Sequence, residues 1–223
     1  MSSSSGPDIV EDGLILCLDA GDPKSYKGSG TTWHDRSGND YNATVESSVS
    51  YSSAHGGGLT TLNDLLNTNQ SIYGSFSCSS EDYTWEIWLT DNGSQGSDPS
   101  AFGVKDVGGI TSNGFRAQPN MQQWVNGSLE LTNYSVPTST PTQIVLRRSG
   151  TSFKSFVNAE LDSTKTGPSD YATFISYSMN DRSHTSSNNG WNGTYYIVRM
   201  YNFALSDDEI TQNFSATKSR FGL

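Results

Sequence analysis

Hydrophobic and polar residues alternate along much of the chain, a pattern that predicts β-strands joined by polar turns. The clearest strand signals are "GLILCLDA" at 13–20, "YTWEIWLT" at 83–90 and "GTYYIVRMYNFAL" at 193–205. Residues 141–150 and 151–161 predict a hairpin around Ser149 and Gly150. No repeat of fixed period divides the chain, so we expect a single all-β domain rather than a solenoid or a propeller.

The C-terminal segment departs from this pattern and predicts a short helix. Ser206 and Glu209 have the spacing of a capping box, in which each side chain accepts a hydrogen bond from the other residue's backbone N–H. Ile210 and Phe214 are four residues apart, so they share one helix face. A helix of two to three turns is marginal alone in water. We therefore expect these two residues to pack on the last strand.

Composition and charge limit the classes of binding partner that we expect. The chain has 223 residues, only 16% of which are charged, and its net charge of −10 argues against nucleic acid or an anionic membrane surface. No run of about 20 apolar residues predicts a membrane span. Residues 1–9 contain neither the basic nor the apolar stretch of a signal peptide. We expect a flexible leader at 1–9 and one domain at 10–223.

The reactive residue types form no recognised metal or nucleophile motif. Cys17 lies in an apolar strand, and we expect Cys17 and Cys78 to be buried free thiols. The spacing of the two cysteines and three histidines matches no zinc signature. The tetrapeptide "HGGG" at 55–58 resembles an oxyanion hole, but no Gly-x-Ser-x-Gly nucleophile motif accompanies it. We interpret this tetrapeptide as a turn.

Glycoside hydrolysis would need a pair of carboxylates, about 5–5.5 Å apart in a retaining enzyme. The strand at 83–90 offers Glu86, followed by Asp91. A spacing of five residues places these two side chains on opposite faces of a strand. We therefore expect no enzyme activity and interpret Glu86 as a polar residue on the solvated or groove-lining face.

Four segments together resemble one known family. They are "DGLILCLDAGDPKSYKGSGTTWHDRSGNDYNAT", "YTWEIWL", "IVLRRSGTSFKSFVNAEL" and "GWNGTYYIVRMYNFALSDDEITQNFSATKSRFGL". They resemble motifs of the laminin-G-like, concanavalin A-like domains of tailed-bacteriophage virion proteins, and the likeness is weakest at about 91–140. Phe203, Ala159 and Arg36 depart from the family pattern.

The resemblance implies an all-β, two-sheet antiparallel jelly-roll sandwich with a short C-terminal helix. We expect the fold to be defined by Trp33, Trp85, Trp191, Ser206, Glu209, Ile210 and Phe214. The resemblance also implies that some relatives bind calcium at a rim of the sandwich. Calcium is thus the candidate cofactor, because it binds oxygen ligands and the loops supply several aspartates. These are Asp19, Asp22, Asp35, Asp40, Asp91, Asp98 and Asp106.

Two segments combine aromatic, amide and charged side chains in the way that a glycan site requires. The first is 108–128 and the second is 180–193. The candidate glycan-binding residues are Phe115, Arg116, Gln122, Trp124, Asn126, Asp181, His184 and Asn188. Trp124 could equally be a core residue, and Trp191 in the second segment is better explained as packing at the start of a strand.

Three functions remain open, because a fold alone does not fix a function. The first is a non-enzymatic bacteriophage virion protein, a capsid decoration, head-fibre or tail surface component that contacts other virion proteins and forms a homo-oligomer. The second is a carbohydrate-binding adhesion module that recognises host-surface glycans, with or without calcium. The third and least favoured is an enzyme that cleaves glycans.

Overall fold

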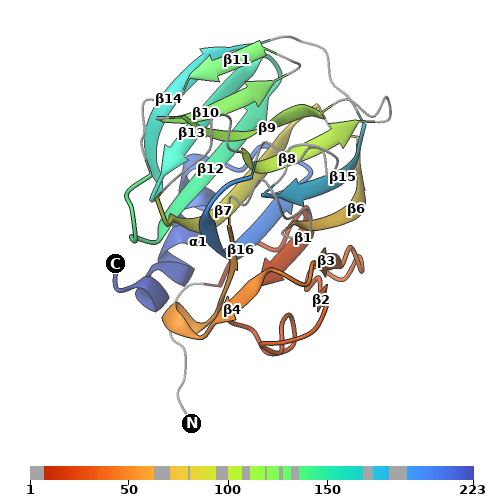
Figure 1. Cartoon of the computed structure of the whole chain (residues 1–223). Helices are drawn as coiled ribbons and strands as arrows, with labels where there is room; N and C mark the ends of the chain where they lie inside the picture. Colours follow the sequence, from red (N-terminus) through yellow and green to blue (C-terminus); the bar gives the residue numbers. More distant parts are fainter. Residues whose placement is uncertain are drawn as a thin grey trace.

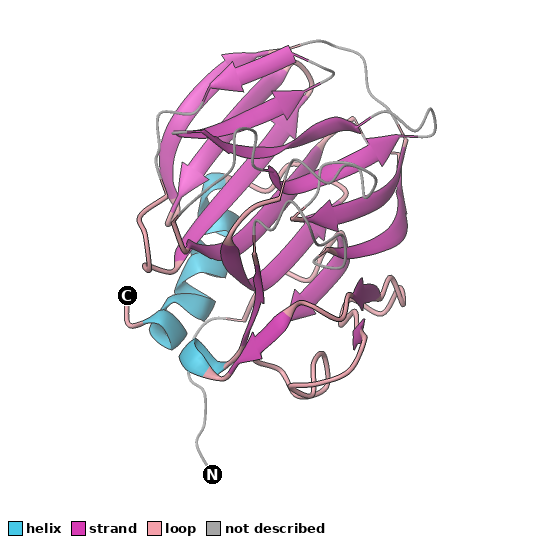
Figure 2. Ribbon diagram, viewed as in Figure 1, coloured by secondary structure: helices cyan, strands magenta, loops and turns pink. Residues whose placement is uncertain are grey.

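The computed structural model shows two antiparallel β-sheets packed face to face, with one short α-helix beside them (Figures 1 and 2). This confirms the predicted sandwich with a C-terminal helix. The structure describes residues 8–62, 71–79, 81–93, 100–106, 111–118, 120–125, 128–131, 136–167, 173–180 and 190–223. In this part of the chain no helix has the length and apolar character that crossing a bilayer requires.

The first sheet contains the strands with the clearest sequence signals. Its strands are β1 (Leu14–Asp19), β4 (Ser50–Ser52), β5 (Gly58–Thr61), β7 (Tyr83–Asp91), β12 (Thr142–Ser149), β13 (Ser152–Val157), β14 (Glu160–Thr166) and β16 (Gly193–Tyr201). Their order is β14-β13-β12-β7-β16-β5-β4, and β1 also pairs with β16. Nearly every residue of β7 and β16 is buried, which means that both faces of these central strands are covered.

The second sheet contains the strands with weaker sequence signals. Its strands are β2 (Thr32–Trp33), β3 (Ala43–Val45), β6 (Ile72–Cys78), β8 (Ser100–Asp106), β9 (Thr111–Gln118), β10 (Asn120–Val125), β11 (Ser128–Leu131) and β15 (Phe174–Met179). Their order is β11-β10-β9-β8-β15-β6-β3-β2. The run from β8 to β11 comes from the part of the chain where the family likeness is weakest.

The core lies between the sheets and is rich in aromatic rings. Trp33, Trp85 and Trp191 are at most 1% exposed. The ring of Trp85 contacts Phe102 edge-on at 5.7 Å between centroids, which joins the two sheets. Trp191 packs at the start of β16, as expected, close to Gly193, where a Cβ would overlap its ring. Cys17 and Cys78 are buried and form no disulfide with each other, also as expected.

The C-terminal helix α1 (Asp207–Thr217) has the predicted capping box between Ser206 and Glu209. Ile210 is 1% exposed and belongs to an apolar cluster on the outer side of the first sheet. Phe214 is partly buried and stacks on Trp88, with 5.7 Å between ring centroids. A short 3₁₀ helix, η2 (Lys218–Phe221), follows α1 and ends at Gly222, which has a φ of +76°.

Two predicted strands end earlier than the sequence suggested. β16 stops at Tyr201 instead of continuing to 205, and the Leu205 N–H donates to the Thr84 hydroxyl. The predicted strand at 151–161 is two strands, β13 and β14. Asn158 and Ala159 interrupt it with φ values of 49° and 67°, the left-handed conformation of a two-residue hairpin turn.

The first described residues of the chain are hydrogen-bonded to helix α1. The Asp8 carbonyl accepts a hydrogen bond from Gln212 Nε2 at 2.7 Å. The Val10 N–H donates to Asn213 Oδ1 at 2.8 Å. Both partners belong to α1, so residues from Asp8 onward are attached to the helix, while residues 1–7 lie outside the described chain.

Candidate functional site

A pocket of about 210 Å³ opens on the outer face of the second sheet, the face directed away from the core. Three adjacent strands form it: β6, β15 and β8. The lining residues are Tyr73, Gly74, Ser75, Gly103, Lys105, Ser176, Tyr177 and Ser178. Its walls thus offer hydroxyl groups, an ammonium group and aromatic surface within one small space, and we call it the serine pocket.

Strand alternation explains why these residues reach the outer face. In β6, Ile72 and Phe76 are buried in the core, so the intervening Tyr73 and Ser75 point outward. The same alternation in β15 places Ser176 and Ser178 outward. Small side chains at three of these four outward positions leave the hollow that forms the pocket.

An inward-facing tyrosine fixes β15 against β6 beneath the pocket. The Tyr177 hydroxyl donates a hydrogen bond to the Tyr41 carbonyl at 2.8 Å. Its ring crosses Gly74, where an added Cβ would lie 2.4 Å from the hydroxyl oxygen. Burial raises the pKa of Tyr177 well above its ordinary value, so the hydroxyl remains a neutral donor. The floor of the serine pocket is therefore held in place from the core side.

The strand register extends this site across the sheet. Ser178 pairs with Tyr73 on one side and with Gly103 on the other. Gly103 pairs with Gly114, and Gly114 pairs with Trp124. Directly paired residues share one face of a sheet, so these five positions form a transverse row on the pocket side. Adjacent strands lie about 4.8 Å apart, which gives the row a length of about 19 Å.

The structure brings together only some of the predicted glycan-binding residues. Arg116 pairs directly with Gln122, and both are two residues from the transverse row, as members of β9 and β10. Trp124 lies in the row itself. Phe115 pairs with Phe102, a buried core residue, so its position is on the core side of the sheet. The remaining candidates lie outside the described residues: Asn126, Asp181, His184 and Asn188.

Sequence reasoning missed the residues that line the pocket. Tyr73, Lys105, Ser176 and Ser178 were not among the candidates, although they form most of its outward-facing wall. The signal that could have found them is the alternation in "SIYGSFSC" and "FISYSM", where apolar residues alternate with serine or tyrosine. Serine and glycine are also typical turn residues, so the composition of these segments did not predict strands.

The loop aspartates considered for calcium mostly bind protein donors. Asp35 accepts hydrogen bonds from the Cys17 N–H at 2.8 Å and from the Ser37 N–H at 2.9 Å. Asp22 pairs with Arg36 at 3.2 Å. Among the described side chains, no three His, Cys, Asp or Glu residues lie close enough together to hold a metal ion. Asp98 lies outside the described chain, and calcium binding stays a prediction.

Glu86 lies beneath helix α1, and the expectation that it faces solvent or a groove was wrong. Its side chain is 1% exposed. Oε1 accepts hydrogen bonds from Arg199 at 2.7 Å and from Gln143 at 3.0 Å. The same oxygen accepts from Trp88 Nε1 at 3.2 Å, and Oε2 accepts from Asn213 at 2.9 Å. The helix covers this carboxylate, and the hydrogen bonds from these four side chains replace those that water would make.

The ion pair between Glu86 and Arg199 is structural. Burial alone would lower the pKa of Arg199, but the adjacent Glu86 carboxylate outweighs this effect and raises the pKa above its ordinary value. Arg199 also donates to the Thr217 hydroxyl at 3.2 Å, which links the sheet to the end of α1. With its oxygens bonded to protein donors under a helix, Glu86 has no access to a sugar.

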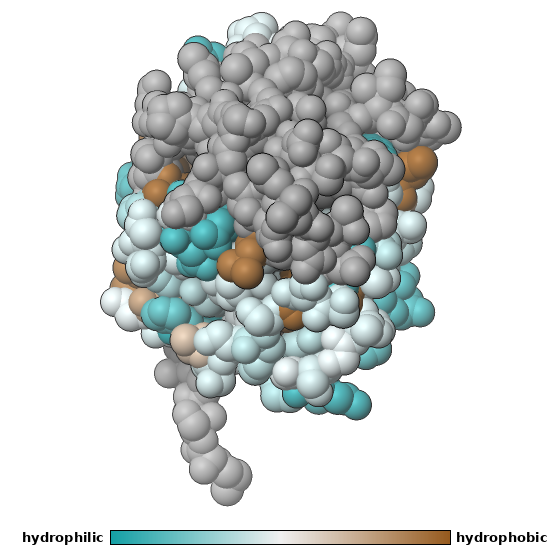
Figure 3. All heavy atoms as spheres, viewed as in Figure 1, coloured by the Kyte–Doolittle hydropathy of each residue, from teal (hydrophilic) through white to brown (hydrophobic). Residues whose placement is uncertain are grey.

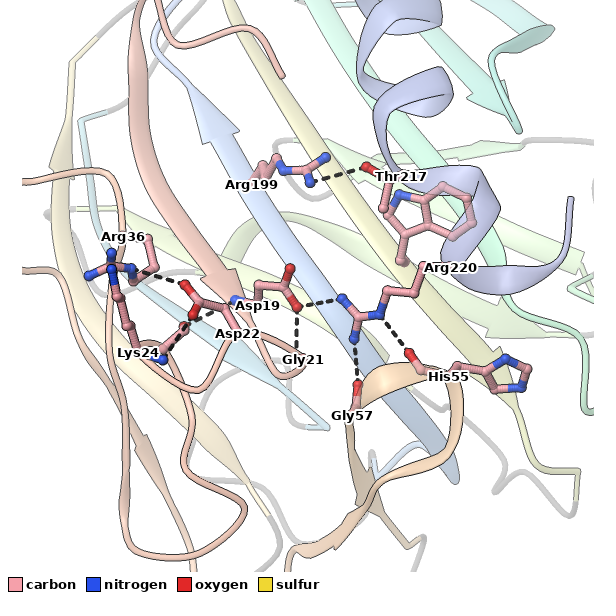
Figure 4. Close-up of polar contacts among 12 residues, drawn as sticks. Asp19, Gly21, Asp22, Lys24, Arg36, His55, Gly57, Arg199, Thr217 and Arg220 are labelled. Carbon is pink, nitrogen blue, oxygen red and sulfur yellow. Dashed lines mark hydrogen bonds and ion pairs between the residues drawn. The ribbon is translucent and has the colours of Figure 1, made fainter. Parts of the chain in front are cut away.

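The "HGGG" turn anchors the C-terminus of the chain. In Figure 4, Arg220 reaches from η2 into this turn, where its guanidinium donates to the carbonyls of His55 at 2.6 Å and Gly57 at 2.7 Å. It also pairs with Asp19 at 2.5 Å. An oxyanion hole presents N–H donors, whereas this turn presents carbonyl acceptors to a cation, which supports its interpretation as a structural turn.

The family model described as the concanavalin A-like lectin/glucanases superfamily matches residues 63–211. The chain belongs to this superfamily. No curated protein matches it. The two sheets therefore form a lectin-like, carbohydrate-binding fold.

Several solved structures share the fold at low sequence identity. The binding domain of Paraclostridial Mosquitocidal Protein 1 is 16% identical, with a TM-score of 0.67 over 92% of this chain and 52% of that one. A structure of botulinum neurotoxin type C, whose cell entry depends on two ganglioside molecules, is 13% identical, with a TM-score of 0.72 over 93% and 52%. This chain thus spans about half the length of both toxin chains.

A third structure matches along its whole length. Domain 4 of an extracellular arabinanase from Geobacillus stearothermophilus, solved in complex with arabinotriose, is 15% identical, with a TM-score of 0.66. The match covers 92% of this chain and 100% of that domain. At these identities the likeness establishes the shared fold.

Proposed function

We propose that this chain is a non-catalytic carbohydrate-binding module and that the serine pocket is its glycan site. The observation that carries the proposal is the composition of this pocket, in which hydroxyl groups, an ammonium group and a tyrosine meet on the outer face of a lectin-like sheet. A glycan presents hydroxyl groups at its rim and C–H groups on its ring faces. Serine hydroxyls both donate and accept hydrogen bonds, and a tyrosine ring offers apolar contact area.

The surroundings of the pocket suit an extended polar ligand. The transverse row continues from Tyr73 to position 124, well beyond the pocket itself. In the space-filling view of Figure 3, the described surface is mainly hydrophilic, with apolar residues in small separate groups. Large contiguous apolar patches are typical of protein–protein or membrane interfaces, and the described part of this view shows none.

A second hollow, between β12, β13 and the start of α1, is a weaker candidate. It has a volume of about 420 Å³ and includes Arg147 and Lys154 in its lining. The Arg147 guanidinium is already hydrogen-bonded within the protein, because it donates to the Leu205 carbonyl and to Asp207, both at 2.6 Å. This hollow is therefore explained by the attachment of the helix.

The buried position of Glu86 supports a module that binds without cleaving. Glycoside hydrolases use two carboxyl groups that flank the scissile bond. Glu86, the carboxylate considered for this role, lies beneath α1 on the outer side of the first sheet, whereas the serine pocket opens on the second sheet. The arabinanase domain in complex with arabinotriose shows that a domain of this fold can hold an oligosaccharide.

The direct test is a glycan array followed by titration calorimetry with Tyr73→Ala. Loss of the aromatic wall should weaken binding at least tenfold, a loss typical of an aromatic contact at a binding site. Tyr51→Ala is the matched control, because Tyr51 is a partly exposed tyrosine of β4 in the other sheet. Repeating the array with added calcium and with EDTA tests the predicted cofactor. Absence of binding to every glycan in both conditions would contradict the proposal.

We further propose that the module is displayed on a bacteriophage virion, in contact with other virion proteins and with copies of itself. Support comes from the resemblance of the N- and C-terminal segments to virion-protein motifs. Mass spectrometry of purified particles tests this location. A particle that lacks the chain would exclude the virion without affecting the glycan site, so the two proposals can fail separately.

A further inference from the structure

We propose that the serine pocket selects glycans that carry carboxylate groups over neutral ones. The inference rests on the proposed function and adds the chemical class of the ligand. The charged strand positions on the pocket side of the second sheet are opposite in sign to the net charge of the whole chain.

Charged residues are rare in the second sheet, and register separates them by sign. Its strands contain two cations, Lys105 and Arg116, and two acids, Asp106 and Glu130. Lys105 pairs with Ser176, which lines the pocket. Arg116 pairs with Gln122, two residues from the transverse row. Both cationic positions are therefore on the pocket side.

Strand register places the two acidic residues at positions on the core side of the sheet. Asp106 pairs with Phe174, a buried core residue. Glu130 pairs with Gln123, which in turn pairs with Phe115 on the core side. Among the strand positions that the structure describes on the pocket side, the charges are thus exclusively positive. In a chain of net charge −10, such a face differs from the average surface.

The two cationic positions flank the transverse row. Lys105 is two residues beyond Gly103 in β8, and Arg116 is two residues beyond Gly114 in the antiparallel strand β9. Because β8 and β9 run in opposite directions, the two positions lie on opposite sides of the row. At about 3.4 Å per residue, they are about 14 Å apart along the strands, so successive acidic groups of one glycan can approach both positions.

Lys105 is available to a ligand. Its side chain lines the serine pocket and is partly exposed. The ion pairs found among the described residues involve other cations, namely Arg36, Arg147, Arg199 and Arg220. A carboxylate that enters the pocket would form a charge-assisted hydrogen bond with the ammonium group, and such bonds are stronger than those between neutral partners.

The test compares matched pairs of glycans that differ in charge. The probes are sialyllactose against lactose, and tetragalacturonate against its methyl ester, presented on the array and then measured by calorimetry. We expect the acidic member to bind about tenfold more tightly than its neutral partner, as one charged hydrogen bond would give. Raising the salt concentration should weaken only the binding of the acidic member.

Variants then assign the preference to the pocket. Lys105→Met should remove most of the difference between the two members of a pair, and Lys105→Arg should retain it. Lys165→Met is the control, because it removes the same charge from the exposed strand β14 of the first sheet. We expect this control to behave like the wild type.

The outcomes separate this inference from the proposed function. Equal affinity for acidic and neutral members, or binding to neutral glycans alone, would overturn the inference and leave a glycan-binding module. An equal loss in Lys165→Met and Lys105→Met would also overturn it, because the preference would then come from net charge. Absence of binding to the entire array would contradict the proposed function itself.

Discussion

The outer faces of the two sheets differ in what lies on them. On the first sheet, α1 covers a row in which Cys17 pairs with Arg199, and Arg199 with Glu86. On the second sheet, the corresponding outer face carries tyrosine, serine, glycine and lysine around an open pocket. One face is covered by the protein's own C-terminal helix, whereas the described part of the other carries the serine pocket.

The burial patterns of the strands reflect this difference. Eight of the nine residues of β7 are buried, and such a strand needs cover on both sides. In β6, buried residues alternate with more exposed ones, which is the pattern of a sheet with one face open. The number of buried faces in a strand therefore indicates whether its outer side serves the fold or remains available for binding.

The largest expected effect comes from breaking the buried ion pair under the helix. Arg199→Met leaves the Glu86 carboxylate buried without its cation, a change that typically costs about 3–5 kcal/mol in the free energy of unfolding. Chemical denaturation of the purified variant measures this cost.

The double variant Glu86→Gln with Arg199→Met shows whether charge is the cause. Replacement of both partners removes the unpaired charge, so the double variant should be more stable than Arg199→Met alone. A cost below about 1 kcal/mol for the single variant would mean that water reaches the carboxylate and that the helix does not seal this face.

A smaller effect is expected from placing a charge at the apolar contact of the helix. Ile210→Asp removes a fully buried side chain and introduces a carboxylate, which should lower the free energy of unfolding by about 2–4 kcal/mol. Thermal unfolding should then occur several degrees lower. If thermal stability does not change, the helix contributes nothing to the fold.

The matched control introduces the same carboxylate on the open face. Ser75 is exposed on the outward side of β6. Ser75→Asp should change the free energy of unfolding by no more than about 0.5 kcal/mol, as is usual for surface positions. A cost as large as that of Ile210→Asp would mean that the second sheet is also covered, which would remove the contrast between the two faces.

The sequence predicted the helix well because its signals are local. The capping box joins Ser206 and Glu209, three residues apart, and the apolar pair Ile210 and Phe214 repeats at helical spacing. The burial of Glu86 could not be predicted in this way, because one of its donors, Asn213, is 127 residues away. Whether a polar residue in a strand is solvated depends on what covers the strand, and a local pattern does not contain that information.

The candidate site was harder to predict from the sequence, for a related reason. Trp124 and Arg116 were chosen for their chemistry, and the register places both on the pocket side. Tyr73 and Lys105 were missed because they belong to separate strands that become neighbours of β15 only in the folded sheet. A pocket that combines three distant segments has no signature within any one of them.

The smallest expected effect concerns the stability of the covered face in alkaline solution. Burial raises the pKa of the Cys17 thiol from 9.0 to about 11, although the adjacent Arg199 opposes the shift. Between these pH values the unfolded chain loses the thiol proton while the folded chain retains it, so stability falls as the pH rises. The loss should reach ~2 kcal/mol near pH 11. Urea denaturation across this range should show a steeper decline in the wild type than in Cys17→Ala, which lacks this thiol. Parallel declines in the two proteins would mean that water reaches Cys17 and that the helical side of the sandwich is as open as the other.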